Sequence, residues 1–244
     1  MAVSNVNSTA PEAVGFGNFG ELKTELFRDG FLSLNHITDA GDIRWIREII
    51  IDLLTDRSVE APKNLGDADT GGGAKILEIA SPSALRPCLL ESRFFQRALQ
   101  FSRAVLGPSA SLGFDHCITK PPFNATATAW HQDCAYKRIT RTPRRLHWWL
   151  PLQDVNIQNG CMQFVRGSHL GSVQAHAPRS PRAQALQTYL PPGAVPVVCP
   201  LEAGGATIHL PKTLHYTGPN NTDTTRYAWI VQFGVRGWIP TILR

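Results

Sequence analysis

The sequence lacks the features of a disulfide-stabilised or membrane-spanning protein. Its five cysteines are widely spaced, odd in number and form no C-x-x-C pair, which argues against a disulfide framework and a cysteine-based zinc site. No apolar run approaches the ~20 residues needed to cross a bilayer. The first fifteen residues have neither a basic start nor an apolar segment, and the last residues carry no targeting tripeptide. We therefore expect a cytoplasmic protein without a membrane partner.

Acidic residues are scarce in the second half of the chain. Residues 1–136 carry 12 Lys and Arg against 16 Asp and Glu, whereas residues 137–244 carry 12 against 3. Within 137–182, eight basic residues accompany a single acidic residue, Asp154. This segment is either a solvated basic face or a positive rim around a site for an anionic small molecule. Aromatic residues do not alternate with the basic ones, so nucleic acid is not an expected partner.

The composition predicts one domain with a large core. Hydrophobic residues make up 43% and charged residues 18% of the 244 residues, which excludes disorder over the whole chain. Residues 1–18 are small and polar, and we expect a flexible tail there. Residues 19–244 are expected to form a single domain.

The first half of the chain shows helical patterns. We expect a helix over 19–30 that ends at Gly30, a strand over 31–34, a helix from about Asp39 to Thr55, and an amphipathic helix over 91–106. Residues 56–75 contain Pro62 and three consecutive glycines, and are expected to form either a lid over a site or a disordered surface loop.

From residue 111 onward, short β-type runs alternate with Pro, Gly and Asn. This pattern is typical of a sandwich or barrel, with the earlier helices packed on its outside. The expected strands lie within 111–120, 125–133, 144–155, 161–165, 194–200, 205–210 and 226–235. Residues 181–190 are expected to form a helical insertion.

Two side chains in the sequence WHQD form a candidate metal pair. His131 and Asp133 are two residues apart, so on a strand they would point the same way. A lone H-x-D pattern has weak specificity, and most such pairs bind nothing. A second, distant histidine would complete a set of two histidines and one carboxylate, which leaves half of an octahedral Fe(II) coordination sphere free.

The sequence alone leaves the second histidine open. The downstream histidines are His147, His169, His176, His209 and His215. His215 is expected at a strand end before a turn, and His209 is the rival. Arg226 opens an otherwise uncharged apolar strand, where it either binds an anion or stays in water at the strand end.

Four segments carry a resemblance to a known family. They are FRDGFLSLNHITDAGDIRWI at 27–46, KPP at 120–122 followed by WHQD, WWLPLQDVNIQNGCMQFVRGSH at 148–169, and HYTGPNNTDTTRYAWIVQF at 215–233. Together they resemble the phytanoyl-CoA hydroxylase family of Fe(II)/2-oxoglutarate-dependent dioxygenases, from about Glu21 to Gly237. The resemblance implies a double-stranded β-helix core (a jelly-roll, cupin-like fold) with N-terminal helices packed outside.

The resemblance also implies roles for individual residues. His131, Asp133 and His215 would be the iron ligands, and His169 would be structural. Arg226, Thr217, Lys120 and Trp149 would bind or flank the 2-oxoglutarate co-substrate, although Trp149 could equally be a core residue and Lys120 a solvated one. The family usually has Pro where Arg166 stands, which is expected to alter the rim of the site.

The implied reaction is oxidation, most simply hydroxylation, of an unactivated C–H in a small-molecule metabolite, with 2-oxoglutarate converted to succinate and CO2. The carboxylate at position 133 argues against halogenation, since related halogenases have a small residue there. A desaturase, cyclase or epimerase on the same scaffold is the alternative. A non-catalytic cupin-like binding module and a nucleic-acid demethylase are the other rivals.

Overall fold

The computed structural model describes residues 18–56, 63–64, 76–136, 144–178 and 185–235. The segments 1–17, 57–62, 65–75, 137–143, 179–184 and 236–244 lie outside the described residues. Most of the predicted tail, lid and basic rim therefore fall outside them.

The first two helices begin and end where the sequence provides caps. Helix α1 (Phe19–Asp29) starts at Asn18, whose side chain accepts from the Gly20 N–H, and ends at Gly30 with φ of 88°. Helix α2 (Ala40–Thr55) starts at Asp39, which accepts from two backbone N–H groups. A Cβ at position 30 would lie 2.4 Å from Nδ1 of His169. Glycine at that position therefore permits both the left-handed turn and the close approach of the histidine.

The other elements of the first half match the prediction in part. Strand β1 (Phe31–Leu34) joins α1 to α2. The remaining elements before residue 121 are β2 (Lys63–Asn64), β3 (Leu77–Ala80), α4 (Pro82–Leu85), the 3-10 helix η1 (Pro87–Glu91), α5 (Arg93–Leu106) and β4 (Ala110–Lys120). Of these elements, β1, α5 and β4 lie where the sequence predicts them, whereas β3 and α4 were not predicted. Strand β2 corrects the expectation that 56–75 holds no regular structure, because Lys63 and Asn64 pair with β3.

The second half is built from short strands, as expected. Its elements are β5 (Thr128–His131), η2 (Asp133–Tyr136), β6 (Arg145–Pro151), β7 (Met162–Phe164), η3 (Ser168–Leu170), β8 (Ala177–Pro178), β9 (Leu186–Gln187), β10 (Val197–Cys199), β11 (Ala206–His209), β12 (His215–Thr217) and β13 (Arg226–Val235). The predicted helix over 181–190 is wrong in its described part, because Leu186 and Gln187 form β9, which pairs with β8.

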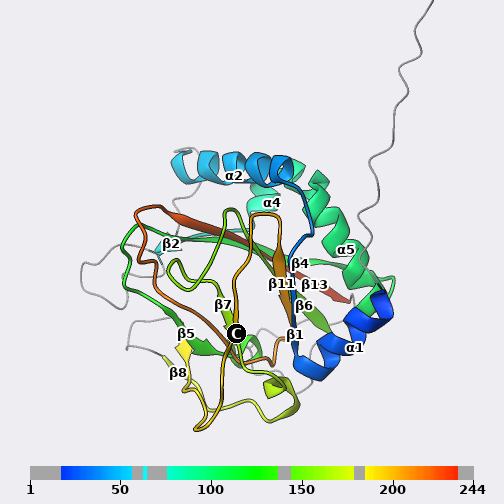
Figure 1. Ribbon diagram of the computed structural model, residues 1–244. Helices are drawn as coiled ribbons and strands as arrows, with labels where there is room; N and C mark the ends of the chain where they lie inside the picture. Colours follow the sequence, from blue (N-terminus) through cyan, green and yellow to red (C-terminus); the bar gives the residue numbers. More distant parts are fainter. Residues whose placement is uncertain (1–17, 57–62, 65–75, 137–143, 179–184, 236–244) are drawn as a thin grey trace, which may run out of the picture.

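Two antiparallel sheets form a jelly roll. The larger sheet has the order β1-β11-β6-β13-β4-β3-β2 and the smaller has the order β10-β7-β12-β5. Helices α1, α2 and α5 lie along the outside of the fold (Figure 1). The fold is mainly β with N-terminal helices packed outside, as the resemblance implied.

Side chains of the larger sheet divide between two cores. Trp148 and Trp229 point to the helices and pack with Phe94 of α5, where Trp148 also donates from Nε1 to Ser102 Oγ. Trp149 and Ile230 belong to a second cluster inside the jelly roll. Because both faces are buried, β6 and β13 show nearly continuous apolar runs rather than strict alternation.

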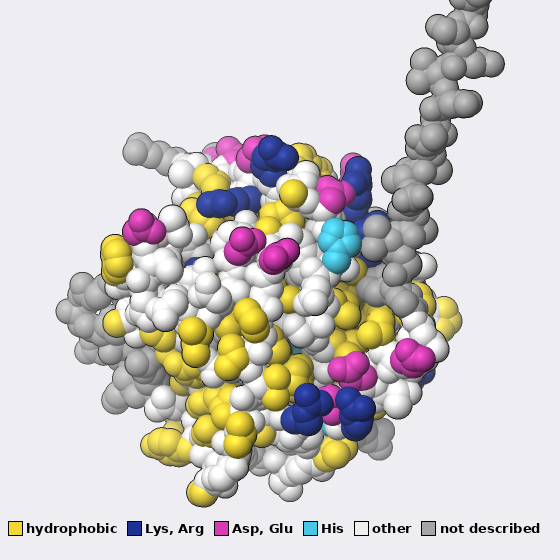
Figure 2. All heavy atoms as spheres, in the orientation of Figure 1, with side chains coloured by type: hydrophobic (Ala, Val, Ile, Leu, Met, Phe, Trp, Pro, Cys, Tyr) yellow, Lys and Arg dark blue, Asp and Glu magenta, His cyan; other side chains and the backbone are white. Residues whose placement is uncertain are grey.

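The surface shown in Figure 2 is mixed in character. Hydrophobic side chains gather on its lower half, and basic side chains stand in small groups beside acidic ones. None of the described helices is long and apolar enough to cross a membrane.

Candidate metal and co-substrate site

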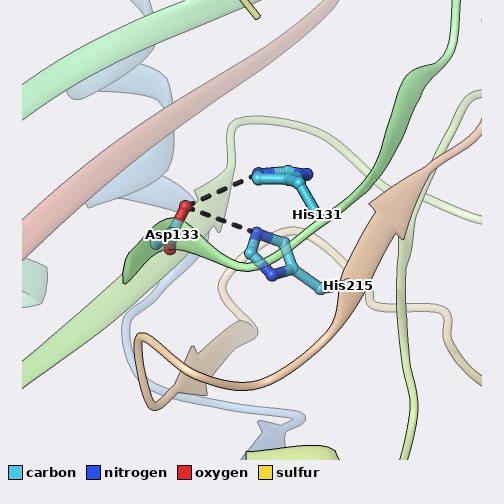
Figure 3. Close-up of side chains that lie close together, drawn as sticks. All are labelled: His131, Asp133 and His215. Carbon is cyan, nitrogen blue, oxygen red and sulfur yellow. Dashed lines mark ion pairs between the residues drawn. The ribbon is translucent and has the colours of Figure 1, made fainter. Parts of the chain in front are cut away.

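Three side chains from two distant parts of the chain converge inside the jelly roll. His131 ends β5, His215 begins β12, and the two residues are direct register partners in the smaller sheet. Asp133 Oδ1 lies 3.5 Å from His131 Nε2 and 3.7 Å from His215 Nε2 (Figure 3). These distances are too long for good hydrogen bonds but suit three ligands of one ion.

Asp133 does not lie on a strand, although the prediction of the metal pair assumed that it would. Strand β5 stops at His131, and Asp133 opens the 3-10 helix η2 instead of continuing the strand. The carboxylate therefore reaches the histidine through a turn and not through strand alternation. The pair was correctly expected to face one place, but for a different geometric reason.

In both histidines a hydrogen bond from Nδ1 fixes the tautomer, so the lone pair of Nε2 points toward Asp133 Oδ1. His131 Nδ1 donates to the Ala129 carbonyl at 2.8 Å, and His215 Nδ1 donates to the Thr213 carbonyl at 2.9 Å. In the neutral ring the opposite nitrogen, Nε2, is then an acceptor. Two Nε2 lone pairs and a carboxylate oxygen thus converge without a proton between them. A cation resolves this arrangement, which is typical of histidine metal ligands.

A cavity of about 670 Å³ contains this cluster. Arg226, Trp149 and Thr217 line it together with the three residues of the cluster. Its volume falls within the usual range for small-molecule sites. The cavity therefore has room for a co-substrate and a second small molecule.

Arg226 is a buried cation with unused donors. Its Nε and Nη1 atoms are buried and have no hydrogen-bond partner, and its guanidinium lies 5.6 Å from the centre of the Trp149 ring. Burial, opposed by Cys117 and Cys161, lowers the pKa of Arg226 to about 10, so the group stays charged at neutral pH. A buried guanidinium with free donors fits a ligand carboxylate.

Lys120 and Thr217 lie beside this guanidinium. Lys120 is the register partner of Arg226 and donates from Nζ to Thr217 Oγ1 at 2.9 Å and to the Gly218 carbonyl at 2.6 Å. Since the Thr217 oxygen accepts from lysine, its own proton is available to another acceptor. Thr217 lines the cavity whereas Lys120 lies behind it, so Lys120 contacts the site through Thr217.

The second oxygen of Asp133 faces two other histidines. Oδ2 is in direct contact with His147 Nδ1 and lies 3.0 Å from His209 Nε2. His147 and His209 are register partners on β6 and β11 of the larger sheet. These three residues are a second group with metal-binding spacing, so proximity alone does not decide between His209 and His215 as the second histidine ligand.

Burial and neighbouring charges act together on these groups. Burial raises the pKa of the Asp133 carboxyl, but the neighbouring His147 and His215 and the hydrogen bond from His147 outweigh it and hold that pKa well below its usual value. Burial, with His131 second, holds the pKa of His215 well below its usual value. Burial likewise lowers the pKa of His209. The lowered pKa of Asp133 favours an ionised carboxylate and the lowered pKa of His215 favours a neutral ring, which are the protonation states that bind a metal.

Other residues singled out from the sequence lie away from the cluster. His169 Nε2 donates to the Phe27 carbonyl at 2.9 Å, which is a structural contact. His176 Nε2 accepts from the Gln132 N–H at 3.0 Å. Arg166 pairs with the buried Asp29 and lies over the Phe31 ring, so it supports α1 and does not line the cavity.

One polar pair in the cavity wall had no sequence signal. Glu78 Oε1 and His116 Nδ1 are 2.5 Å apart, and both residues line the cavity. They come from β3 and β4, whose pairing brings together residues 38 positions apart. No motif marks either residue, so only the register of the two strands shows the pair.

The jelly roll, the two-histidine, one-carboxylate cluster and the buried arginine define the class of iron- and 2-oxoglutarate-dependent oxygenases. The profile of the phytanoyl-CoA dioxygenase (PhyH) family matches residues 27–228, and the chain belongs to this family. The family's cofactor and co-substrates are iron, 2-oxoglutarate and O2.

Curated relatives match over part of their length. Phytanoyl-CoA dioxygenase domain-containing protein 1 from Bos taurus is 29% identical over 119 residues, and the Mus musculus protein of that name is 27% identical over 121 residues. The matches cover 46% and 47% of this chain, and 40% and 41% of those proteins. The chain thus matches less than half the length of these relatives.

Solved structures match over most of the chain. EvdO2 from Micromonospora carbonacea, complexed with 2-oxoglutarate, has 28% identity and a TM-score of 0.71, with 89% of this chain and 93% of that one covered. SnoN, a non-heme α-ketoglutarate-dependent epimerase from nogalamycin biosynthesis, has 24% identity and a TM-score of 0.67, with 89% and 83% covered. The likeness to SnoN shows the fold alone.

Proposed function

We propose that the protein hydroxylates an unactivated C–H of a small-molecule metabolite as an Fe(II)- and 2-oxoglutarate-dependent dioxygenase. The observation that carries this proposal is the convergence of two Nε2 lone pairs and one carboxylate oxygen. His131, Asp133 and His215 would hold the iron. When bound, the iron with 2-oxoglutarate and O2 supplies the oxidation and yields succinate and CO2.

The residues around the cluster would bind and orient 2-oxoglutarate. Arg226 would grip its far carboxylate through the unpartnered Nε and Nη1 donors, and the Thr217 hydroxyl would donate to the same group. Lys120 would hold Thr217 in place, and Trp149 would pack beside the guanidinium. Apolar residues of the cavity lining such as Met162 and Ile230 would limit the access of water to the reacting atoms.

The outer part of the cavity would accept the metabolite. Ile76, Phe114 and Leu186 supply apolar surface there, and the partly buried Arg145 adds a positive charge. Arg145 favours a substrate with an anionic group, such as a carboxylate. The absence of a nucleic-acid partner and a cytoplasmic location remain predictions that rest on the sequence.

The first experiment tests the metal ligands. Metal-free protein is titrated anaerobically with Fe(II) and 2-oxoglutarate while the visible charge-transfer absorption is recorded, and succinate is then measured in air with and without a metabolite extract. His131→Ala and Asp133→Ala are expected to abolish both signals, whereas His36→Ala, an exposed histidine, retains them. Undiminished absorption and turnover in both ligand variants would contradict the proposal.

Product mass decides between hydroxylation and its alternatives. SnoN is described as an epimerase and SnoK as a carbocyclase on the same fold, so the scaffold is compatible with reactions that add no oxygen to the product. We expect the product to gain one oxygen atom. A loss of two hydrogens would indicate desaturation or ring closure, and an unchanged mass would indicate epimerisation. A complete lack of succinate would favour a non-catalytic binding module.

A further inference from the structure

His147 and His209 form a two-donor clamp on Asp133 that the proposed reaction has not yet used. Both rings are buried, and both contact Oδ2, the carboxylate oxygen that faces away from His131 and His215. Because the two histidines are register partners on β6 and β11, the larger sheet fixes their separation. Asp133 belongs to η2, which follows β5 of the smaller sheet. The clamp contacts it from the larger sheet, on the opposite wall of the jelly roll.

The unused nitrogens of the clamp show where its protons lie. His147 Nε2 and His209 Nδ1 are buried and have no hydrogen-bond partner. A buried N–H without an acceptor is unfavourable, so in the neutral rings the protons are on His147 Nδ1 and His209 Nε2. These are the two atoms that contact Asp133. An ionised carboxylate oxygen only accepts, so both contacts are hydrogen bonds donated to Oδ2.

The positions of the protons also distinguish the clamp histidines from His131 and His215. In His131 and His215 the nitrogen remote from Asp133 donates to a backbone carbonyl, which leaves the near nitrogen free to bind a metal. In His147 and His209 the remote nitrogen has no acceptor, which leaves the proton on the near nitrogen. A near nitrogen that carries a proton has no lone pair for a metal, so the clamp histidines donate to Oδ2 instead of binding an ion.

We propose that His147 and His209 are positioning residues that hold Oδ2 of Asp133 so that only Oδ1 reaches the iron. This inference rests on the proposed iron site. A carboxylate held in this way binds through one oxygen. If Asp133 bound through both oxygens, it would occupy an additional coordination position, and three protein ligands with a bidentate co-substrate leave only one position for O2.

Paired variants test whether the donor atoms matter. His147→Leu and His209→Met remove the donors at similar size. His147→Asn restores an N–H near the Nδ1 position, and His209→Gln restores one near the Nε2 position. In the exchanged variants His147→Gln and His209→Asn, the amide N–H lies near the position of the other ring nitrogen, which does not contact Asp133.

Two measurements are made on each metal-free variant. One is the Fe(II) affinity at saturating 2-oxoglutarate, followed anaerobically by the visible charge-transfer absorption, and the other is the unfolding temperature without metal. The Leu and Met variants are expected to bind Fe(II) about 10–100-fold more weakly, the range for partners of metal ligands, with a shifted absorption band. The Asn and Gln variants should recover most of the affinity and the band position, whereas the exchanged variants should not.

Specific outcomes would overturn the clamp. Wild-type affinity and an unshifted band in all variants would show that the clamp does not act on the iron, while the iron site itself stands. Loss of iron in His147→Asn and His209→Gln as complete as in His131→Ala would make these histidines ligands. Failure of the wild-type protein to bind Fe(II) would instead refute the proposed function. If the Leu or Met variant does not fold, the comparison of matched and exchanged amides decides.

Discussion

The unpartnered guanidinium of Arg226 has opposite effects on stability and on binding. Burying a charge without a counter-ion destabilises a fold, and Arg226 is only 2% exposed with two unsatisfied donors. The same donors are ready for a carboxylate without prior rearrangement. The buried charge of Arg226 thus lowers the stability of the ligand-free protein, and a bound carboxylate would restore it.

We predict that Arg226→Met raises the unfolding temperature of the ligand-free protein, because an apolar side chain replaces an uncompensated buried charge. For a domain of this size, each kcal/mol gained corresponds to about 2–4 °C. The variant should also lose the further stabilisation that 2-oxoglutarate gives the wild type in the presence of Mn(II). Thermal unfolding with and without each ligand measures both effects.

Arg44→Met is the matched control for this prediction, because Arg44 is exposed on α2. It should leave the 2-oxoglutarate response unchanged. If Arg226→Met still gains stability with 2-oxoglutarate as the wild type does, the carboxylate is bound elsewhere.

Sequence patterns identify some residues of this site and miss the roles of others. His131 with Asp133, and His215 followed eleven residues later by Arg226, stand in recognisable spacing, and the structure brings them to one cavity. His147 and His209 were both among the candidate ligands, yet no spacing shows which oxygen of Asp133 they face. That role depends on the β6–β11 register and on the absence of acceptors at their remote nitrogens.

Among the elements, helix α2 is capped at its N-terminus by Asp39. Asp39 accepts from the N–H groups of Gly41 and Asp42 at 2.9 and 3.1 Å, and it pairs with Arg93 at the start of α5. The hydrogen bond from the Asp42 N–H, opposed by desolvation and aided by Arg93, lowers the pKa of Asp39. One carboxylate thus links the ends of two helices that cover the larger sheet.

We predict that Asp39→Ala lowers the free energy of unfolding by about 1 kcal/mol at neutral pH, the usual value for an N-cap. Because folding lowers the pKa of Asp39, its charge stabilises the fold above its ordinary value of 3.8. That contribution is lost as pH falls through the lowered pKa of the folded state. The difference between wild type and Asp39→Ala should therefore shrink in acid.

Urea unfolding of both proteins at neutral and acidic pH measures this difference. Asp39→Asn is the control, because its amide oxygen still caps the helix but does not ionise. A gap between wild type and Asp39→Ala that stays constant with pH would show that the charge of Asp39 adds nothing to the cap.

Helices and strands were predictable to different degrees for physical reasons. Caps and a single apolar face are local, and they placed α1 and α2 within a residue or two of their observed ends. Strands β8 and β9 are each two residues long and owe their form to pairing with one another, which no local pattern encodes. The turn at Asp133 likewise ends β5 earlier than alternation suggests.

On the scale of the whole molecule, the site joins the two sheets of the jelly roll. His131 and His215 stand on the smaller sheet, whereas Arg226 and the clamp histidines His147 and His209 stand on the larger one. A metal bound at Asp133 and a co-substrate gripped by Arg226 would connect both walls. Ligand binding is therefore expected to stabilise the domain as a unit and not one sheet alone.

We predict that Mn(II) and 2-oxoglutarate together raise the unfolding temperature by more than the sum of their separate effects, because each completes a binding site for the other. Hydrogen exchange should slow in β5 and β12 as well as in β13 and β6. Arg226→Met should keep the response to Mn(II) alone but lose the excess, since the grip on 2-oxoglutarate is gone. If the two ligands instead stabilise additively, and exchange slows only in the smaller sheet, the co-substrate does not bridge the cavity.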